Sequence, residues 1–209
     1  MLQKYKVILW DFDGVIMDSM PVRTKGFAEV LKDYPTEQVQ QLLDFHEVNG
    51  GLSRYYKFRY FFEKIRNEEI TEEQVLALAE KFSVIMLSLL QDETLLIPDA
   101  LGFIKQNATR YIMHVVSGSD QTELRTICGA VDIQQYFKSI HGSPTSKIEL
   151  VRQIIAFNDY KKSDVVLIGD SVNDFDAAVA NGIDFCGYNN QHVSGLSGSY
   201  INSFADLLK

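Results

Sequence analysis

The chain has 209 residues, of which 46% are hydrophobic and 23% are charged, and its formal net charge at pH 7 is -8. This composition is typical of an ordinary globular protein and excludes disordered and fibrous classes. The acidic balance argues against nonspecific binding to nucleic acid or to an anionic membrane, because both depend on basic surface patches.

Cysteine usage and the N-terminus indicate a compartment. Cys128 and Cys186 lie far apart and form no CxxC pair, so neither a disulfide framework nor a zinc site is predicted. No leader pattern opens the chain, and no apolar run reaches the roughly 20 residues that span a bilayer. We expect a cytoplasmic protein with a small-molecule partner and with no membrane or nucleic-acid partner. No feature of the sequence indicates an oligomeric state.

The first predicted element is a buried strand at residues 7–10, which ends on Asp11-Phe12-Asp13-Gly14. Residues two apart in a strand point the same way, so Asp11 and Asp13 project together while Phe12 turns to the other side and packs. Gly14 lets the backbone turn or approach a ligand closely. Two carboxylates held this close repel each other unless a proton or a cation compensates, and a divalent metal is the simplest compensation.

The stretch between residues 20 and 91 shows no credible strand and at least three helical segments. One helix begins at Thr36, and the capping box Thr71-x-x-Gln74 opens a long helix that runs to Leu90. Between them, four side chains share one helical face: Tyr55, Phe58, Phe62 and Ile65. The pattern predicts an all-helical insert between the first strand and the rest of the sheet.

Short apolar runs, each bounded by Gly, Ser or Asp, predict further buried strands at 111–116, 165–168 and 183–186. Helical patterns at 121–128, 147–157 and 173–180 alternate with these strands, and a last short helix is expected at 203–208. This alternation implies an α/β fold with a parallel sheet covered by helices on both faces. We predict a discontinuous α/β domain of residues 1–17 and 96–209, interrupted by a helical domain of residues 18–95.

More polar residues follow the predicted strands, at the sheet edge where open parallel sheets bind ligands. Asp170 and Asp174 follow the strand at 165–168, and D-x-D plus G-D-x-x-x-D supplies the oxygen ligands that suit Mg²⁺. In Ser117-Gly118-Ser119 the hydroxyl and the backbone N–H groups at a helix start suit a phosphate. Taken singly, these aspartates and serines are also ordinary turn and cap residues.

Lys147 occupies an unusual place. The capping box Ser146-x-x-Glu149 puts it in the first turn of a helix, where the helix dipole disfavours a cation. Binding an anionic phosphoryl group, or restraining a nucleophilic carboxylate, would explain that position; a plain surface lysine is the alternative. Three other lysines do not fall at that helix start and are poorer candidates: Lys138, Lys161 and Lys162.

The joint pattern resembles the haloacid dehalogenase superfamily of phosphohydrolases. Its motifs are matched in order by Asp11-Phe12-Asp13-Gly14, Ser117, Lys147 and Gly169-Asp170 through Asp174. The third motif often reads Lys-Pro in the nearest branches, whereas Ile148 follows the lysine here. The helical insert resembles the C1 cap of the phosphoglycolate phosphatase and β-phosphoglucomutase branch.

The resemblance implies an HAD-like Rossmannoid fold and a Mg²⁺-dependent phosphatase acting on a sugar phosphate or a phosphorylated organic acid. Asp11 would carry an aspartyl-phosphate, and Asp13 would be the general acid–base, a role that needs a pKa raised toward neutrality. Ser117 and Lys147 would bind phosphoryl oxygens. The metal would be held by Asp11, the Asp13 carbonyl and Asp170, with Asp174 orienting the metal ligands or the lysine, and with Gly14, Gly118 and Ser119 in support.

The insert offers candidates for substrate recognition. His46 and Arg54 flank an Asn49-Gly50-Gly51 turn and would contact the leaving group, although a lone histidine is usually structural. Opening and closing of the insert, with residues 92–98 as one hinge, would gate the site. A phosphomutase of the β-phosphoglucomutase type and a non-catalytic binding or regulatory module remain alternatives. Asp13 argues against a dehalogenase or a phosphonatase.

Overall fold

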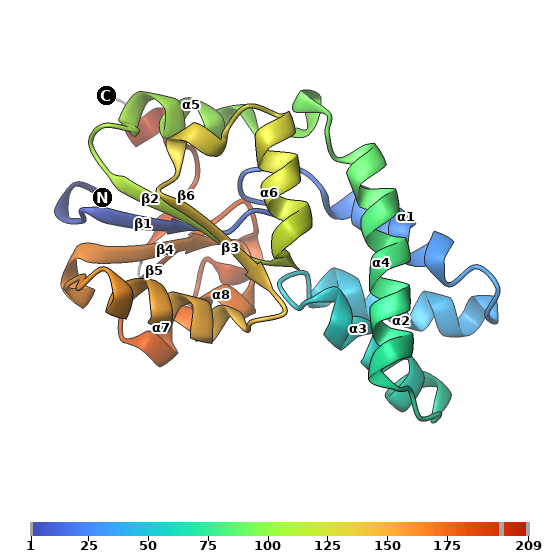
Figure 1. The fold of residues 1–209 in the computed structure, drawn as a ribbon. Helices are drawn as coiled ribbons and strands as arrows, with labels where there is room; N and C mark the ends of the chain where they lie inside the picture. The colour runs from blue at the N-terminus through green and yellow to red at the C-terminus, as the bar shows by residue number, and fades with distance from the viewer. Residues whose placement is uncertain (1, 197–198, 208–209) are drawn as a thin grey trace.

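Within residues 2–196 and 199–207, which the computed structural model describes, six parallel strands form one sheet (Figure 1). They are β1 (Val7–Trp10), β2 (Ile112–Asp120), β3 (Ser139–Ser143), β4 (Val165–Gly169), β5 (Asp184–Tyr188) and β6 (Tyr200–Ile201). Their order across the sheet is β3-β2-β1-β4-β5-β6, so the strand order reverses at β1. The predicted α/β fold is confirmed.

Both faces of the sheet are buried, which is why the two strands β1 and β4 are apolar throughout. On β1, Ile8 and Trp10 join the hydrophobic core that includes α5 (Pro98–Asn107) and α6 (Gln121–Ala130). The alternate residues, Val7 and Leu9, join a second core with helices α7 (Lys147–Phe157) and α8 (Val172–Asn181). Figure 1 shows the two helix pairs on opposite faces of the sheet.

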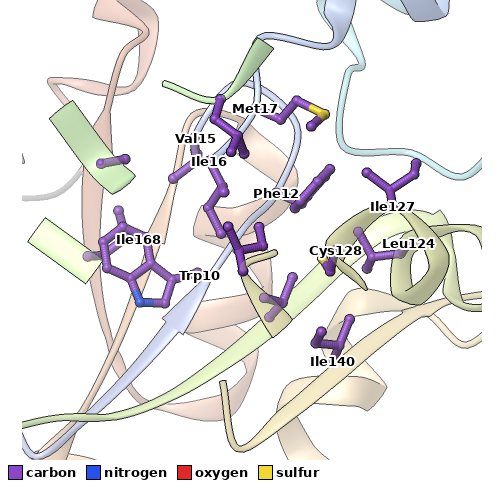
Figure 2. Close-up of a cluster of buried hydrophobic side chains, with 14 of the residues drawn as sticks. Trp10, Phe12, Val15, Ile16, Met17, Leu124, Ile127, Cys128, Ile140 and Ile168 are labelled. Atoms are coloured by element: carbon purple, nitrogen blue, oxygen red, sulfur yellow. The ribbon is translucent and has the colours of Figure 1, made fainter. Parts of the chain in front are cut away.

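The loop after β1 is anchored by its apolar side chains (Figure 2). Phe12 is fully buried in the same cluster as Leu124 and Ile127 of α6. Its carbonyl oxygen accepts hydrogen bonds from the backbone N–H groups of Ile16 and Met17. The turn therefore has a fixed shape, and it holds the residues on either side of Phe12 at the sheet edge.

Five α-helices lie between β1 and β2 in the described chain, and the four that precede α5 form the insert: α1 (Met20–Val30), α2 (Thr36–Val48), α3 (Arg54–Tyr60) and α4 (Glu72–Leu89). The chain continues from α3 directly into a π-helix at Phe61–Arg66. The predicted capping box at the start of α4 is present, because Thr71 and Gln74 exchange side-chain-to-backbone hydrogen bonds. Rings of Phe27, Phe58 and Phe82 meet in the centre of these helices.

The two connections between the sheet and the insert run side by side. Met17 forms an antiparallel bridge with Leu96, and the Asp18 N–H donates to the Leu95 carbonyl oxygen over 2.8 Å. The Ile97 N–H donates to the Ile16 carbonyl oxygen over 2.9 Å. The insert thus leaves and rejoins the sheet domain through one pair of hydrogen-bonded segments. These segments lie beside the predicted domain boundaries at residues 17/18 and 95/96, and the division into two domains stays a prediction.

The sequence patterns do not predict β3, β6, α1 or α5. Both strands lie at the edges of the sheet, where one side is open, so neither needs the continuous apolar run of a central strand. Near the C-terminus, a 3₁₀ helix at Phe204–Leu207 occupies the predicted last helix, and residue 208 lies outside the described residues. No helix in the described part of the chain is both long and apolar enough to cross a bilayer.

Candidate active site

The predicted site residues converge where the strand order reverses. Asp11 directly follows β1, Ser117 lies in β2 and Asp170 directly follows β4. Because β2 and β4 are the two parallel neighbours of β1, these residues lie side by side at the carboxyl ends of the three central strands. In open α/β sheets, ligands bind in the crevice at this topological switch point.

Three carboxylates form a compact group there. One oxygen each from Asp11, Asp170 and Asp174 lies within 4.8 Å of the others. Burial, together with the charge of Asp174, raises the pKa of Asp11 well above its usual value and raises the pKa of Asp170 to about 7. The crowding of negative charge therefore disfavours full ionisation of the group unless a cation joins it.

Lys147 is the ammonium that faces this group. Its Nζ lies 2.8 Å from Asp11 Oδ1 and also donates to Asp174 Oδ1. Burial lowers the lysine pKa, but the charges of these two carboxylates outweigh it and raise the pKa above its usual value. Asp174 is in turn fixed by the Ser171 N–H over 3.1 Å and the Ser171 hydroxyl over 2.6 Å. The carboxylates offset the unfavourable place of a cation in the first turn of α7.

The donor set fits a magnesium ion. It offers only oxygen atoms from few protein ligands, and its three carboxylates exceed its single ammonium in charge. Gly14 makes the approach possible: its φ is +79°, and a Cβ there would lie 2.2 Å from Asp170 Oδ2. Asp11, Asp170 and the Asp13 carbonyl remain the predicted ligands.

The Asp13 carboxylate points into a different set of partners. Its Oδ1 accepts from the Ser19 hydroxyl and, over 2.5 Å, from Arg23 Nε. Its Oδ2 accepts from the Ser119 hydroxyl over 2.5 Å and from the Ser117 hydroxyl over 3.4 Å. Both carboxylate oxygens are therefore occupied by protein donors.

The pKa of Asp13 differs from the sequence expectation. Burial raises it, but the charge of Arg23 and the hydrogen bonds from Ser119 and Ser19 prevail and lower it to about 2. The raised pKa that a general acid–base role needs is therefore absent here, because Arg23, which no sequence pattern places beside Asp13, lies against the carboxylate. The role of Asp13 stays a prediction. Asp13 is held here as a carboxylate.

The two predicted substrate contacts in the insert are buried. Arg54 Nη1 lies 2.7 Å from Glu123 Oε2 and donates to the Ser83 hydroxyl over 2.5 Å. His46 Nδ1 lies 2.8 Å from Lys57 Nζ. Burial and then neighbouring positive charge lower the pKa of His46 to about 3 and that of Lys57 to about 7. Substrate contact by His46 and Arg54 stays a prediction, since both face protein groups here.

A family model described as haloacid dehalogenase-like hydrolase matches residues 8–188. The chain belongs to this family. A search of curated proteins found no match.

Several solved structures share the fold of this haloacid dehalogenase-like chain. A predicted phosphoglycolate phosphatase from Haemophilus somnus is 20% identical, with a TM-score of 0.75 and coverage of 100% of this chain and 98% of that one. A β-phosphoglucomutase from Clostridium difficile is 15% identical, with a TM-score of 0.76 and coverage of 97% and 93%. CbbY from Rhodobacter sphaeroides, in complex with xylulose-1,5-bisphosphate, is 15% identical, with a TM-score of 0.78 and coverage of 97% and 96%. At these identities the likeness shows the fold alone.

In this family member, two charged residues beside the site, Arg23 and Glu123, are not predicted by the sequence patterns. Arg23 lies on α1, a helix that was not predicted, although Ser19-Met20-Pro21 carries a helix-start signal because proline is favoured in the first turn. Glu123 lies in the first turn of α6, where an acidic residue is ordinary. Neither position has a local pattern that separates it from a surface charge.

Two asparagines after β5 were also missed. The Asn189 side-chain amide donates to the Gly14 carbonyl oxygen over 2.9 Å, and that of Asn190 donates to the Asp170 carbonyl oxygen over 2.8 Å. They fix the two loops that carry the acidic residues. Their place just beyond the carboxyl end of a strand was the available signal.

The Asn49-Gly50-Gly51 turn lies directly against the α/β core. A Cβ on Gly118 would lie 2.3 Å from the Gly51 carbonyl oxygen. Two pockets border this turn. The one of about 650 Å³ is lined by Gly50, Asp13 and Asp170 among others, and the one of about 250 Å³ by Gly51 and Lys147 among others. A larger pocket of about 740 Å³, beside β3 and α7, contains none of the predicted site residues. The insert is thus docked over the acidic groups.

Proposed function

We propose that the chain is a Mg²⁺-dependent phosphatase that hydrolyses a small phosphorylated metabolite through an aspartyl-phosphate intermediate. The observation that supports it best is the placement of Asp11: a buried carboxylate at the switch point, 2.8 Å from Lys147 and grouped with Asp170 and Asp174. Membership of a hydrolase family agrees with this chemistry.

In the first step, an Asp11 oxygen attacks phosphorus in line and forms the phosphoenzyme, which divides one hard displacement into two easier ones. Lys147 and the Ser117 hydroxyl bind oxygens of the transferring group and stabilise its charge. Asp174 keeps Lys147 in place through their hydrogen bond. A bound Mg²⁺, held by Asp11, the Asp13 carbonyl and Asp170, supplies further charge neutralisation at the phosphoryl group.

Asp13 transfers the protons. Once the substrate oxygen has replaced one of its present contacts and the carboxyl has taken up a proton from solvent, Asp13 protonates the leaving alkoxide. The resulting carboxylate then takes a proton from the water that hydrolyses the phosphoenzyme. In the present structure its carboxylate is bound by Arg23 and by serine hydroxyls, so the substrate oxygen must replace at least one of these contacts. The proposed substrate is a sugar phosphate or a phosphorylated organic acid.

A phosphate-release screen over a panel of phosphorylated metabolites, with and without EDTA, tests the proposal. We expect release of free phosphate from at least one small organophosphate, lost with EDTA and restored by added Mg²⁺. Conversion of a sugar phosphate to its isomer without free phosphate would identify a phosphomutase instead. If no compound reacts at any Mg²⁺ concentration, the proposal fails and a binding module of the same fold remains.

A further inference from the structure

The partly buried Asp13 and three buried charged side chains form a chain of ion pairs that leads away from the sheet edge. Arg23 Nε lies 2.5 Å from Asp13 Oδ1, and Arg23 Nη1 lies 3.1 Å from Glu123 Oε1. Arg54 Nη1 lies 2.7 Å from Glu123 Oε2. We call these four residues the buried ion chain. Its signs alternate, so every inner member has an opposite charge on both sides.

The buried ion chain crosses between the sheet domain and the helical insert three times, once at each ion pair. Asp13 and Glu123 belong to the β1 loop and to α6, whereas Arg23 and Arg54 belong to α1 and α3. Figure 1 shows α6 next to the insert. The chain is complete only when the insert is docked against the sheet, because each ion pair joins one part to the other.

Stability alone is a poor explanation for this arrangement. The side chains of Arg23, Glu123 and Arg54 are only 6%, 1% and 2% exposed. Buried ion pairs must overcome a large desolvation cost, and apolar residues of similar size often serve stability as well or better. The position of the chain, which ends on a reacting carboxylate, supplies another reason for it.

Arg23 is oriented by its two carboxylate partners. Within the described chain, the only side-chain hydrogen bonds of Arg23 are to Asp13 and Glu123, and its Nη2 is buried without a partner. The direction of the guanidinium is therefore set by Glu123 from one side. Glu123 is paired in turn with the charge of Arg54 at its Oε2, which accepts no hydrogen bond from the described residues, and Arg54 Nη1 donates to the Ser83 hydroxyl of α4.

We propose that Glu123 and Arg54 are positioning residues that act through Arg23 on the orientation of Asp13, so that leaving-group protonation depends on docking of the helical insert. This inference rests on the proposed phosphatase function. The nucleophile does not depend on the same contacts, because Asp11, Lys147 and Asp174 all belong to the sheet domain. Loss of the buried ion chain therefore impairs proton transfer and leaves the attack on phosphorus largely intact.

The leaving group separates the two steps. An alkyl phosphate needs its leaving oxygen protonated, whereas p-nitrophenyl phosphate loses a stable phenolate without that help. In Glu123→Gln we expect kcat for the best alkyl phosphate of the metabolite screen to fall ~10-fold or more beyond the fall for p-nitrophenyl phosphate. Arg54→Lys keeps the charge but not the planar fork, and we expect a smaller shift in the same direction.

The ratio of the two kcat values is measured within each preparation, so partial unfolding of a variant does not change it. Glu72→Gln is the matched control: it makes the same charge change at an exposed ion pair of the insert, with Arg59, and should leave the ratio unchanged. Equal losses on both substrates in Glu123→Gln and Arg54→Lys, with an active wild type, would overturn this inference alone. A wild type that hydrolyses neither substrate would overturn the proposed function and this inference with it.

Discussion

Two charged groups meet at the end of β1, and they are neutralised in different ways. The acidic group of Asp11, Asp170 and Asp174 faces a single cation, Lys147, and carries excess negative charge. The buried ion chain alternates two carboxylates with two guanidinium groups and compensates itself. The pKa values follow this difference, since that of Asp170 is raised to about 7 and that of Asp13 is lowered to about 2.

The difference indicates a division of labour. A group with excess negative charge suits a site that takes up a metal ion and a phosphoryl group, because the bound cation neutralises that excess charge. A balanced chain keeps its own geometry and suits the control of one carboxylate. Substitutions in the acidic group should therefore change both phosphatase activity and stabilisation by Mg²⁺. Substitutions that disturb the docking of the insert, on which the buried ion chain depends, should change activity but not stabilisation by Mg²⁺.

The largest effect should come from Asp11→Asn. The amide cannot form the acyl phosphate, so we expect phosphatase activity to fall at least ~10³-fold, as when a nucleophile is removed. Phosphate release on the substrate found in the screen measures it. Asp33→Asn, at an exposed turn of the insert, is the control and should keep full activity. Full turnover by purified Asp11→Asn would refute the mechanism.

The second effect concerns pH and metal. The pKa of Asp170 is about 7 in the folded protein and near its usual 3.8 when unfolded, so the folded state holds the proton more tightly. Without metal, the contribution of Asp170 to the free energy of unfolding should therefore decrease as pH rises from about 4 to about 7, by a few kcal/mol. The raised pKa of Asp11 acts in the same direction and the lowered pKa of the buried His46 acts in the opposite one, so comparison with Asp170→Asn isolates the contribution of Asp170.

Urea unfolding between pH 5 and pH 8, in EDTA and in excess Mg²⁺, measures this slope. We expect Mg²⁺ to stabilise the protein more at high pH than at low pH, because it favours the ionised carboxylates. In EDTA, the stability of wild type relative to Asp170→Asn should fall as pH rises, and this difference should shrink in excess Mg²⁺. Equal slopes with and without Mg²⁺ would show that the acidic group does not take up the ion.

The sequence predicts the acidic group better than the buried ion chain for a physical reason. Asp11 and Asp170 each end an apolar run, and the parallel fold then requires those strand ends to meet. Arg23 and Glu123 lie on helix surfaces, where a buried charge and an exposed one look alike in sequence. Only the docking of the insert on α6 makes them partners, and no local pattern encodes that contact.

The same limit applies to the fold. The central strands and the capping box at Thr71 follow from local patterns, and the structure contains them. The sequence does not predict the π-helix at Phe61–Arg66. An aromatic run at helical spacing fits a π-helix, with hydrogen bonds between residues i and i+5, as well as an α-helix, with hydrogen bonds between residues i and i+4. The wider turn of the π-helix places Phe61 in the core, whereas Phe62 of the predicted helical face is only partly buried.

A smaller effect is expected from Gly118→Ala, which tests the contact between the insert and the sheet domain. The added methyl would lie 2.3 Å from the Gly51 carbonyl oxygen, so the insert must shift outward. We expect kcat/KM to fall roughly 10-fold, because small displacements at a reacting centre are costly. Stabilisation by Mg²⁺ should persist, since the acidic group is untouched.

Gly102→Ala is the control for this substitution. Gly102 lies in α5 with no atom within 4 Å of the added Cβ, so alanine should leave kcat/KM unchanged and stabilise the helix by roughly 0.5–1 kcal/mol. Equal kcat/KM values for wild type and Gly118→Ala would mean that the contact with Gly51 does not matter for turnover.

The smallest effect should follow from Thr71→Ala, which removes the cap of α4 far from both charged groups. The Thr71 hydroxyl accepts from the Gln74 N–H over 3.2 Å, and its loss should cost about 1 kcal/mol of unfolding free energy. For a chain of this size that lowers the melting temperature by about 2–4 °C. Activity at 25 °C and the ratio between alkyl and aryl substrates should not change. If the ratio did change, simple loss of stability in the insert would mimic loss of the buried ion chain, and the distinction between the two charged groups would need a different explanation.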